Sequence, residues 1–374
     1  MKKDGLLLTR VFIVTLFLSI GLDILRPFLP LYGVEVGFEP TLVGFAVSIF
    51  FLASGVSRFL SGFISDRFGE YIVICLGVVV SVTGFGILIF PTLFMMGCFI
   101  IGLGAGLWRV PMIAMLSKKT DKRRLGTIFG IFTTIVEASG AIAPLIGALL
   151  IIYGYYAIFI SSIIFTSSSL VFLQRLKIDQ GRKEYTRVYF PREFLHNNVL
   201  KASIFSGFVG GVTIGVANSI WPIFLVDKVN ADYVGVALTY TMYSVGSIFF
   251  PPFTGRLGDK LGEKRNIVLG CLLFSLSYYL FTLSRTIEQI LFLEIVSALA
   301  GAFILPNLLS LTSKNVHKNE YGRFMSIYNT SLLLGCISGS VIGGILYLYN
   351  IDYPLFLCAL LEATCGIVFS LIKI

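Results

Sequence analysis

Charged residues are scarce in this chain of 374 residues: only 13% are Asp, Glu, Lys or Arg, while 56% are hydrophobic. A soluble domain is about one-quarter charged, because its surface must be hydrated. Twenty acids and 29 bases cannot cover a globular core of this size. The scarcity excludes a cytosolic enzyme, a disulfide-rich secreted domain and a disordered regulator. The 38 glycines and 34 phenylalanines fit closely packed helices that face lipid, which predicts a polytopic membrane protein.

Residues for metal or redox chemistry are also few. The six cysteines lie in apolar runs without a CxxC pair, so we expect buried thiols and no metal site. His196 and His317 both lie in predicted loops. The sequence contains no paired catalytic residues and no nucleotide-binding Walker motif. We therefore expect no enzyme, no cofactor and no ATP-driven pump.

Apolar windows long enough to cross the hydrocarbon layer, about 20 residues, occur twelve times. Lipid exposure leaves the helix as the structure for such windows, so the predicted fold class is an all-α protein with twelve transmembrane helices. The predicted spans lie near residues 6–32, 41–65, 71–90, 92–117, 126–152, 155–173, 200–226, 233–254, 266–284, 288–312, 322–348 and 354–372.

The bases are unevenly distributed among the connections. One set of connections carries the basic clusters at 118–124, 175–192, 256–265 and 314–323, whereas the other set holds only Lys228 and Arg285. Basic loops stay in the cytoplasm, so we predict a multi-pass protein of the cell membrane with both termini cytoplasmic. Nucleic-acid binding is the poorer interpretation, because aromatic residues are not interleaved with these bases as they are in stacking platforms.

An internal repeat relates the two ends of the chain. A polar, basic linker at 174–199 separates a six-helix half at 1–173 from another at 200–374. A motif after the second predicted span recurs after the eighth, displaced by 193 residues. The two copies are Gly62-Phe-Ile-Ser-Asp66-Arg67-Phe-Gly69-Glu70 and Gly255-Arg-Leu-Gly-Asp259-Lys260-Leu-Gly262-Glu263. A duplication of six-helix halves is typical of secondary transporters.

The duplicated G-x-x-x-D-[RK]-x-G pattern in a 6+6 chain resembles the major facilitator superfamily, and the resemblance covers essentially the whole chain. It implies two six-helix repeats around a central cavity lined by spans 1, 4, 7 and 10. The chain departs from the family pattern at Glu70, where a basic residue is usual. We predict that the motif loops act in gating, with Asp66 and Asp259 pairing with a neighbouring helix end or arginine in one conformation. The alternative is a pair of loops whose charges only hold helix ends at the interface. The predicted gating residues are Gly62, Asp66, Arg67, Gly69, Gly255, Asp259, Lys260 and Gly262.

Seven charged residues fall inside predicted spans, where each costs at least about 2.5 kcal/mol unless it is paired or hydrated. Asp23 and Arg26 lie three residues apart on one helix face and can meet. Arg109 and Glu137 have similar predicted depths, so they can also pair. We predict that Asp23 or Glu137 carries a proton and that Arg109 or Arg26 binds an anion or restores the charged carboxylate. Structural salt bridges are the alternative. The weaker candidates are Arg58, Glu294 and Glu362.

The second half offers neutral groups in place of charges. Amides, hydroxyls and aromatic rings can orient a ligand within an apolar cleft. Ordinary packing is the competing interpretation. Trp221 occupies the position that corresponds to Arg26 in the repeat. The predicted substrate-binding residues of this half are Asn218, Trp221, Tyr240, Tyr243 and Asn307.

The leading hypothesis is a secondary active transporter that moves a small organic solute by alternating access, by proton-coupled efflux. A run from Gly140 to Pro144 is similar to an antiporter motif of the family and weakly favours antiport. Proton-coupled uptake or facilitated diffusion is one alternative, and a transporter-like sensor or scaffold that moves nothing is another. The expected partners are a small-molecule substrate, protons and the lipid bilayer, without nucleic acid, and we expect a monomer.

Overall fold

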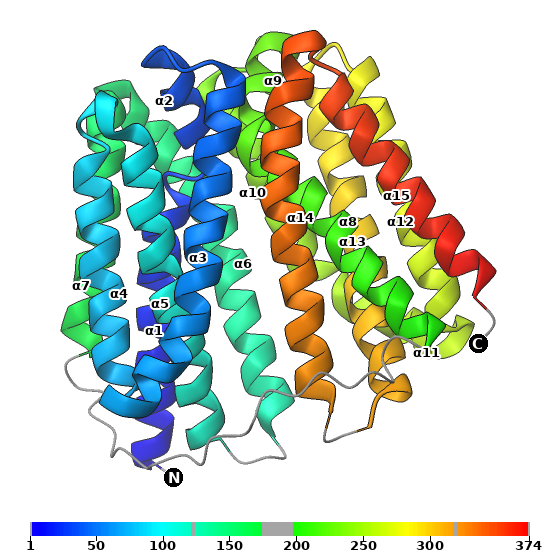
Figure 1. The fold of residues 1–374 in the computed structure, drawn as a ribbon, viewed down its shortest axis with the longest axis horizontal. Helices are drawn as coiled ribbons and strands as arrows, with labels where there is room; N and C mark the ends of the chain where they lie inside the picture. The colour runs from blue at the N-terminus through cyan, green and yellow to red at the C-terminus, as the bar shows by residue number, and fades with distance from the viewer. Residues whose placement is uncertain (1, 121–123, 174–196, 318–319, 373–374) are drawn as a thin grey trace. The chain divides into compact units, whose positions relative to one another are not determined.

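The computed structural model describes residues 2–120, 124–173, 197–317 and 320–372. Every regular element within these ranges is a helix (Figure 1), which confirms the predicted fold class. Most of the predicted linker at 174–199 lies outside the described residues, as do Lys122, Arg123 and His196. The linker therefore stays a prediction.

The chain divides into two compact units. Unit 1 comprises Met1–Gly37 and Ile49–Thr186, and unit 2 comprises Phe38–Ser48 and Arg187–Ile374. The start of one long helix, Pro40–Phe68, thus groups with unit 2 while the rest of that helix groups with unit 1. The division into halves at 1–173 and 200–374 remains a prediction about the repeat.

The first seven helices run from the N-terminus to Leu173. They are α1 (Lys2–Asp23), α2 (Leu29–Glu35), α3 (Pro40–Phe68), α4 (Glu70–Ile87), α5 (Phe94–Lys119), α6 (Leu125–Leu150) and α7 (Tyr155–Leu173). Two 3₁₀ turns, Pro91–Leu93 and Ile151–Tyr153, precede α5 and α7. In the core of unit 1, Trp108 and Met112 of α5 pack with Ile74 and Val78 of α4.

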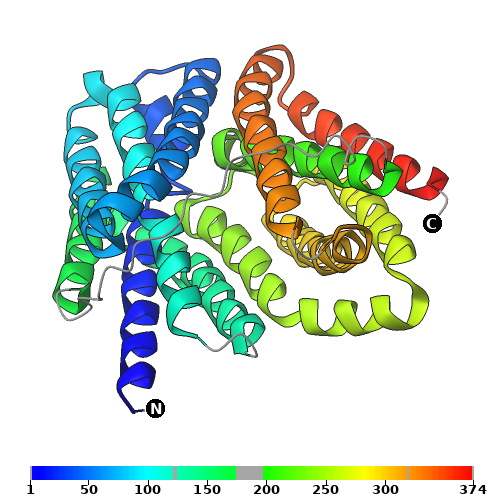
Figure 2. The same cartoon turned by 60° about the horizontal axis from the view of Figure 1, so that its bottom comes forward.

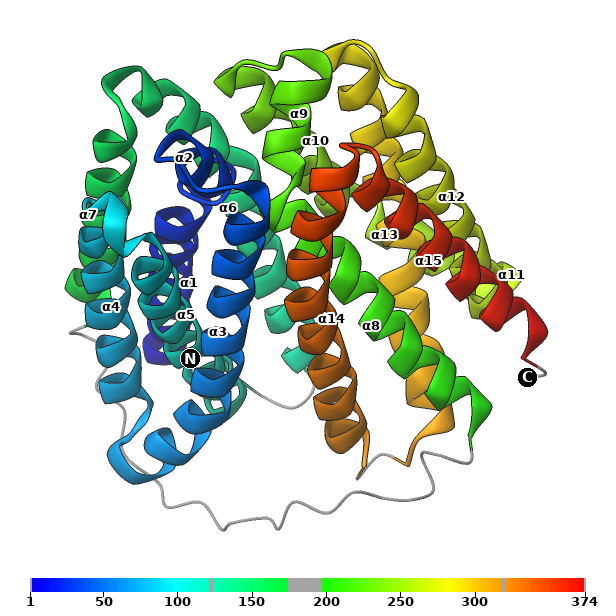
Figure 3. The same cartoon turned by 45° about the horizontal axis from the view of Figure 1, so that its top comes forward.

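Eight helices lie between Asn198 and Leu371, and the first of them begins two residues before the predicted linker ends. They are α8 (Asn198–Ser219), α9 (Trp221–Val229), α10 (Tyr233–Phe249), α11 (Pro251–Leu261), α12 (Glu263–Leu283), α13 (Ile287–Asn315), α14 (Tyr321–Tyr349) and α15 (Tyr353–Leu371). Figures 1 and 3 show α8 and α14 side by side. Added Cβ atoms at Gly211 and Gly335 would overlap the carbonyls of Leu332 and Phe208, so glycine permits this close approach.

Ten of the described helices are long and apolar enough to cross a membrane. The bent pair α10–α11 raises the number of candidate membrane spans to eleven. The segment that completes twelve is α1 with α2. Each predicted span coincides with one helix or with one broken pair of helices.

Three predicted spans are broken where the sequence predicts continuous helices, and a proline lies at each break. Pro27 and Pro222 have no N–H to donate to the carbonyls of Asp23 and Asn218, four residues earlier. Accordingly, α1 ends at Asp23 and α8 ends at Ser219. α10 ends before Pro251, and α11 follows at an angle of 48° to it. The bend between the two helices is visible in yellow-green in Figure 2.

Candidate functional site

The candidate site of unit 1 lies where α1 ends. Asp23 is the last residue of α1, and Pro27 prevents the helix from continuing through the following turn. The break places the carboxylate of Asp23 beside a helix terminus rather than within a regular helix. Broken helices of this kind provide binding groups at mid-membrane depth in many transporters.

Two groups contact the carboxylate of Asp23 directly. The hydroxyl of Ser139, a buried residue of α6, donates a hydrogen bond to Oδ2 of Asp23 at 2.7 Å. Nη1 of Arg26 lies 3.9 Å from Oδ1, so the predicted pair of Asp23 and Arg26 forms. The side chain of Asp23 is 16% exposed and that of Arg26 is 45% exposed.

Arg109 of α5 and Glu137 of α6 complete the cluster. Both interact electrostatically with Asp23 and with Arg26. Arg109 lies ten residues before the end of α5, and Glu137 lies twelve residues after the start of α6. The end of α5 and the start of α6 lie at the same end of unit 1. At 1.5 Å per residue these depths are about 15 and 18 Å. Among the described residues Arg109 and Glu137 form no direct ion pair, so the four charges make a loose cluster with no net charge.

The exposure of the two arginines shows what surrounds the cluster. Arg26 and Arg109 are both exposed, and Glu137 is half-buried. An arginine that faces hydrocarbon at this depth costs about 2.5–3.5 kcal/mol or more. The exposed side of the cluster must therefore face water or a ligand. The arrangement can hold a proton on either carboxylate and can bind an anionic group at either arginine.

The corresponding break in unit 2 carries neutral residues. Asn218 and Trp221 occupy the positions that Asp23 and Arg26 hold in unit 1, each 195 residues later. The amide of Asn218 donates to the carbonyl of Ile214 at 2.7 Å. The hydroxyl of Tyr240 donates to the carbonyl of Ala217 at 3.0 Å, close to the break.

The ring of Trp221 packs against other aromatic rings. It is buried, stacks on Phe224 with ring centroids 5.5 Å apart, and lies 4.7 Å from the ring of Phe281. Its Nε1 donates a long hydrogen bond of 3.4 Å to the hydroxyl of Thr239. Tyr243, by contrast, is 37% exposed and lies over Gly301 of α13.

Asn307 lies in a buried polar cluster that joins α11, α12 and α13. Its amide donates to the carbonyl of Phe303 at 2.9 Å and approaches that of Thr254 at 3.5 Å. Asn266 approaches both Asn307 and the carbonyl of Thr254. A Cβ at Gly258 would overlap the side chain of Asn307. These contacts hold α11, which carries the second motif, against α12 and α13. Helix packing is therefore sufficient to explain why a polar residue lies at position 307.

The two motif copies adopt the same backbone geometry. Gly69 and Gly262 have φ of 87° and 95°, a conformation that favours glycine, and each precedes the helix that follows the motif. Gly62 and Gly255 have open space where a Cβ would lie.

The charged residues of the motifs face outward. Asp66, Arg67, Asp259 and Lys260 are exposed, and the guanidinium of Arg67 lies 5.3 Å from the ring centroid of Phe68. Asp259 interacts electrostatically with Lys314. The gating role of the motif residues stays a prediction.

Sequence reasoning missed a pair of ionic contacts that the repeat duplicates. Glu70 pairs with Lys118 near the end of α5, and Glu263 pairs with Lys314 near the end of α13. The hydroxyl of Ser310 donates a second hydrogen bond to Glu263 at 2.9 Å. Each pair fastens the residue after a motif glycine to the helix that follows in its own unit. The signal was present, because Lys118 and Lys314 are displaced by nearly the same interval as Glu70 and Glu263.

The remaining intramembrane charges lie apart from the cluster of unit 1. Glu294 and Glu362 are buried in unit 2, and Arg58 is half-buried in α3. Five of the six cysteines are buried and Cys75 is half-buried. Within the described residues, His, Cys, Asp and Glu side chains form no group of three that could hold a metal ion.

The fold and the broken, charged helices define a multi-pass membrane transporter of the two-repeat class. A profile of the Major Facilitator Superfamily matches residues 11–201 and 203–373. The chain belongs to this superfamily, as its duplicated motif predicts.

Three relatives share part of the sequence. They are multidrug resistance protein 2 of Bacillus subtilis (28% identical over 159 residues, 42% of this chain), the riboflavin transporter RibZ of Clostridioides difficile (27% over 149 residues, 40%) and the quinolone resistance protein NorA of Staphylococcus aureus (25% over 141 residues, 37%). The chain spans only 38%, 32% and 35% of the length of these relatives.

Solved structures resemble the chain over nearly its whole length. The nucleoside transporter NupG superposes with a TM-score of 0.81 at 13% identity, covering 97% of this chain and 99% of NupG. A POT family transporter in complex with 5-aminolevulinic acid gives 0.80 at 15% identity, covering 99% and 95%. At these identities the likeness establishes the fold.

Proposed function

We propose that this chain is a proton-coupled exporter of a small organic solute that works by alternating access. The observation that carries the proposal is the cluster of two acids and two bases at the end of α1, with a hydrogen-bonded carboxylate and two exposed arginines. Each of these charges is costly in a membrane, so a functional role is the first hypothesis for them.

Asp23 and Glu137 are the groups that exchange the proton in this proposal. Low-dielectric surroundings favour a neutral carboxyl, whereas a neighbouring arginine favours the charged carboxylate. A conformational change that alters hydration or the distance to an arginine therefore loads or releases a proton. Arg26 lies 3.9 Å from Asp23 and interacts with Glu137, so one arginine can act on both carboxylates.

Arg109 and Arg26 also provide the sites for an anionic group of the solute. A substrate-binding role of the neutral residues of unit 2 stays a prediction. Asn218, Tyr240 and Tyr243 are half-buried or exposed, whereas Trp221 and Asn307 are buried in packing contacts. Asn218, Tyr240 and Tyr243 are therefore the stronger candidates for substrate contacts.

The direction of transport is inferred from relatives. Two of them are named for resistance to drugs, and a transporter that confers resistance must lower the internal concentration of the drug. The third is named as a riboflavin transporter. The two resistance names favour export of an organic solute, whereas the name of the riboflavin transporter gives no direction. We further propose that the protein lies in the plasma membrane with both termini in the cytoplasm, because basic connections alternate along the chain with connections that are poor in Lys and Arg. The monomeric state stays a prediction.

Purified protein in liposomes tests the proposal with riboflavin and a fluoroquinolone as probes. An imposed pH gradient should drive accumulation of at least one probe, and Asp23→Asn or Glu137→Gln should abolish it. Glu39→Gln, an equally conservative change at an exposed acid that lies outside the helices, is the matched control and should transport normally. Full gradient-driven transport by both Asp23→Asn and Glu137→Gln would refute the coupling. Binding of a probe without translocation would favour a sensor instead.

A further inference from the structure

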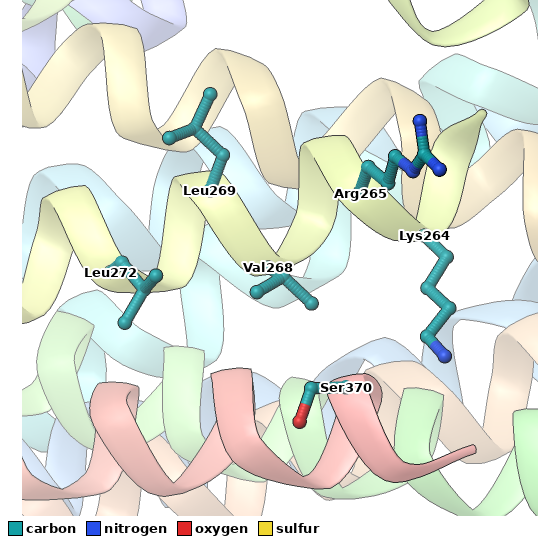
Figure 4. A pocket seen from close by; sticks show the side chains of 6 residues that line it. All are labelled: Lys264, Arg265, Val268, Leu269, Leu272 and Ser370. Carbon is teal, nitrogen blue, oxygen red and sulfur yellow. The ribbon is translucent and has the colours of Figure 1, made fainter. Parts of the chain in front are cut away.

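A hollow on unit 2 lies between the start of α12 and the end of α15 (Figure 4). Its volume is about 330 Å³, and it is lined by Lys264, Arg265, Val268, Leu269, Leu272 and Ser370. In Figure 4 the two bases lie at one end of the hollow and Leu272 lies at the other. The lining thus passes from two positive charges to an apolar wall along a single helix.

The residues of α15 explain why α12 and α15 separate at the hollow. Gly366 allows close packing, since a Cβ there would lie 3.2 Å from Cβ of Cys271 and 3.8 Å from the carbonyl of Val268. One turn later α15 presents Ser370, a small exposed residue, and the hollow opens. The space therefore lies directly beyond the closest packing of the two helices.

The acid that adjoins the two bases in the sequence does not neutralise the positive charge at the mouth. Glu263, which precedes the two bases, is paired with Lys314 and hydrogen-bonded to Ser310 on α13. Lys264 donates one hydrogen bond to the carbonyl of Ile372 at 2.6 Å, which holds its ammonium at the mouth. A lysine has three N–H donors, and toward the described residues Lys264 uses one of them, so two remain for a ligand. Arg265 is exposed.

The depth of the hollow matches a lipid. Lys264 and Arg265 lie in the first turn of α12, at one end of a membrane-spanning helix, where headgroups lie. Leu272 lies eight residues deeper than Lys264, which is about 12 Å along the helix axis. Leu269 and Leu272 are 43% and 52% exposed, so they present apolar surface to an acyl chain. The volume is roughly ten times that of a liquid water, more than a free inorganic phosphate needs.

We propose that this hollow binds one anionic phospholipid, with its phosphate at the ammonium of Lys264 and the start of an acyl chain along Val268, Leu269 and Leu272. The guanidinium of Arg265, which Figure 4 shows on the other side of α12, adds to the positive potential at the mouth. Clusters of Lys and Arg at the cytoplasmic end of membrane helices attract the anionic lipids of that leaflet. Among the described residues the lining contains two bases and no acid, so a phosphate that carries net negative charge is favoured over a zwitterionic headgroup. The proposal does not depend on what the protein transports.

Native mass spectrometry of the full-length protein tests the proposal with phosphatidylglycerol and phosphatidylcholine of the same acyl chains. Each neutralised base should weaken phosphatidylglycerol binding by about fivefold, so Lys264→Gln with Arg265→Gln should weaken it by about 25-fold. Binding of phosphatidylcholine should change little. The matched control neutralises Lys201 and Arg256, two exposed bases of unit 2 that do not line the hollow, and should leave both affinities unchanged.

A second variant tests the apolar part of the site without altering charge. Ser370→Trp places a large ring in the hollow from an exposed position and should lower phosphatidylglycerol binding while both bases remain. Equal affinity of the native protein for the two lipids, or an equal loss in the control variant, would overturn the proposal. Displacement of phosphatidylglycerol by equimolar glycerol 3-phosphate would also overturn it, because the acyl chain would then contribute nothing.

Discussion

Ser139 offers the sharpest test of how Asp23 works. Its hydroxyl donates to Oδ2 of Asp23 at 2.7 Å, and its side chain is completely buried, so water cannot readily replace it. A hydrogen bond to a charged group is worth about 1.5–3 kcal/mol. Each pH unit corresponds to about 1.4 kcal/mol, so Ser139→Ala should move the pH midpoint of proton-driven transport upward by about one to two units.

The assay is the initial rate of probe transport into liposomes, measured across a series of pH values. The midpoint moves upward because Ser139 stabilises the charged carboxylate, and its loss leaves the proton bound at higher pH. Thr133→Ala is the matched control, since Thr133 lies on the same helix and donates only to the backbone carbonyl of Phe129. A folded Ser139→Ala protein with an unchanged midpoint would refute the role given to Asp23.

Three further predictions concern stability, measured as thermal unfolding of the purified protein. Glu70→Gln or Lys118→Met should each cost about 1 kcal/mol, and combining them should cost less than the sum, because both remove the same ion pair; strict additivity would contradict the pairing. Gly69→Ala should cost about 1–3 kcal/mol, since an L-residue is strained at φ of 87°; an unchanged midpoint would argue against that turn. Gly211→Ala should cost about 1–3 kcal/mol by overpacking α8 against α14. Gly210→Ala is the control and should not have this cost, because the added Cβ would lie in open space. Equal effects of the two substitutions would contradict the helix packing.

Hydropathy and the repeat were sufficient to predict the fold. Each of the twelve windows coincides with a helix or a broken pair, because a membrane allows few structures besides helices. The breaks at Pro27, Pro222 and Pro251 were readable in principle, since each proline removes a backbone donor. The predicted continuous spans missed them, because hydropathy alone does not register the loss of a backbone hydrogen bond.

The site was only partly predictable. Spacing was enough to pair Asp23 with Arg26, which lie on one helix face. The contact of Ser139 with Asp23 joins residues 116 positions apart, and it depends on how α1 packs against α6, which no local pattern specifies. For the same reason sequence reasoning could not distinguish Asn218 from Asn307, although only Asn307 lies within a buried packing cluster.

The central claim is that solute and proton move in opposite directions through the same protein. The most direct measurement is the internal pH of liposomes, followed with a pH-sensitive dye, while a riboflavin or fluoroquinolone gradient is imposed without any pH gradient. The account predicts proton movement against the flow of the solute, and its loss in Asp23→Asn or in Glu137→Gln. Solute flux without proton movement, or proton movement in the same direction as the solute, would contradict it.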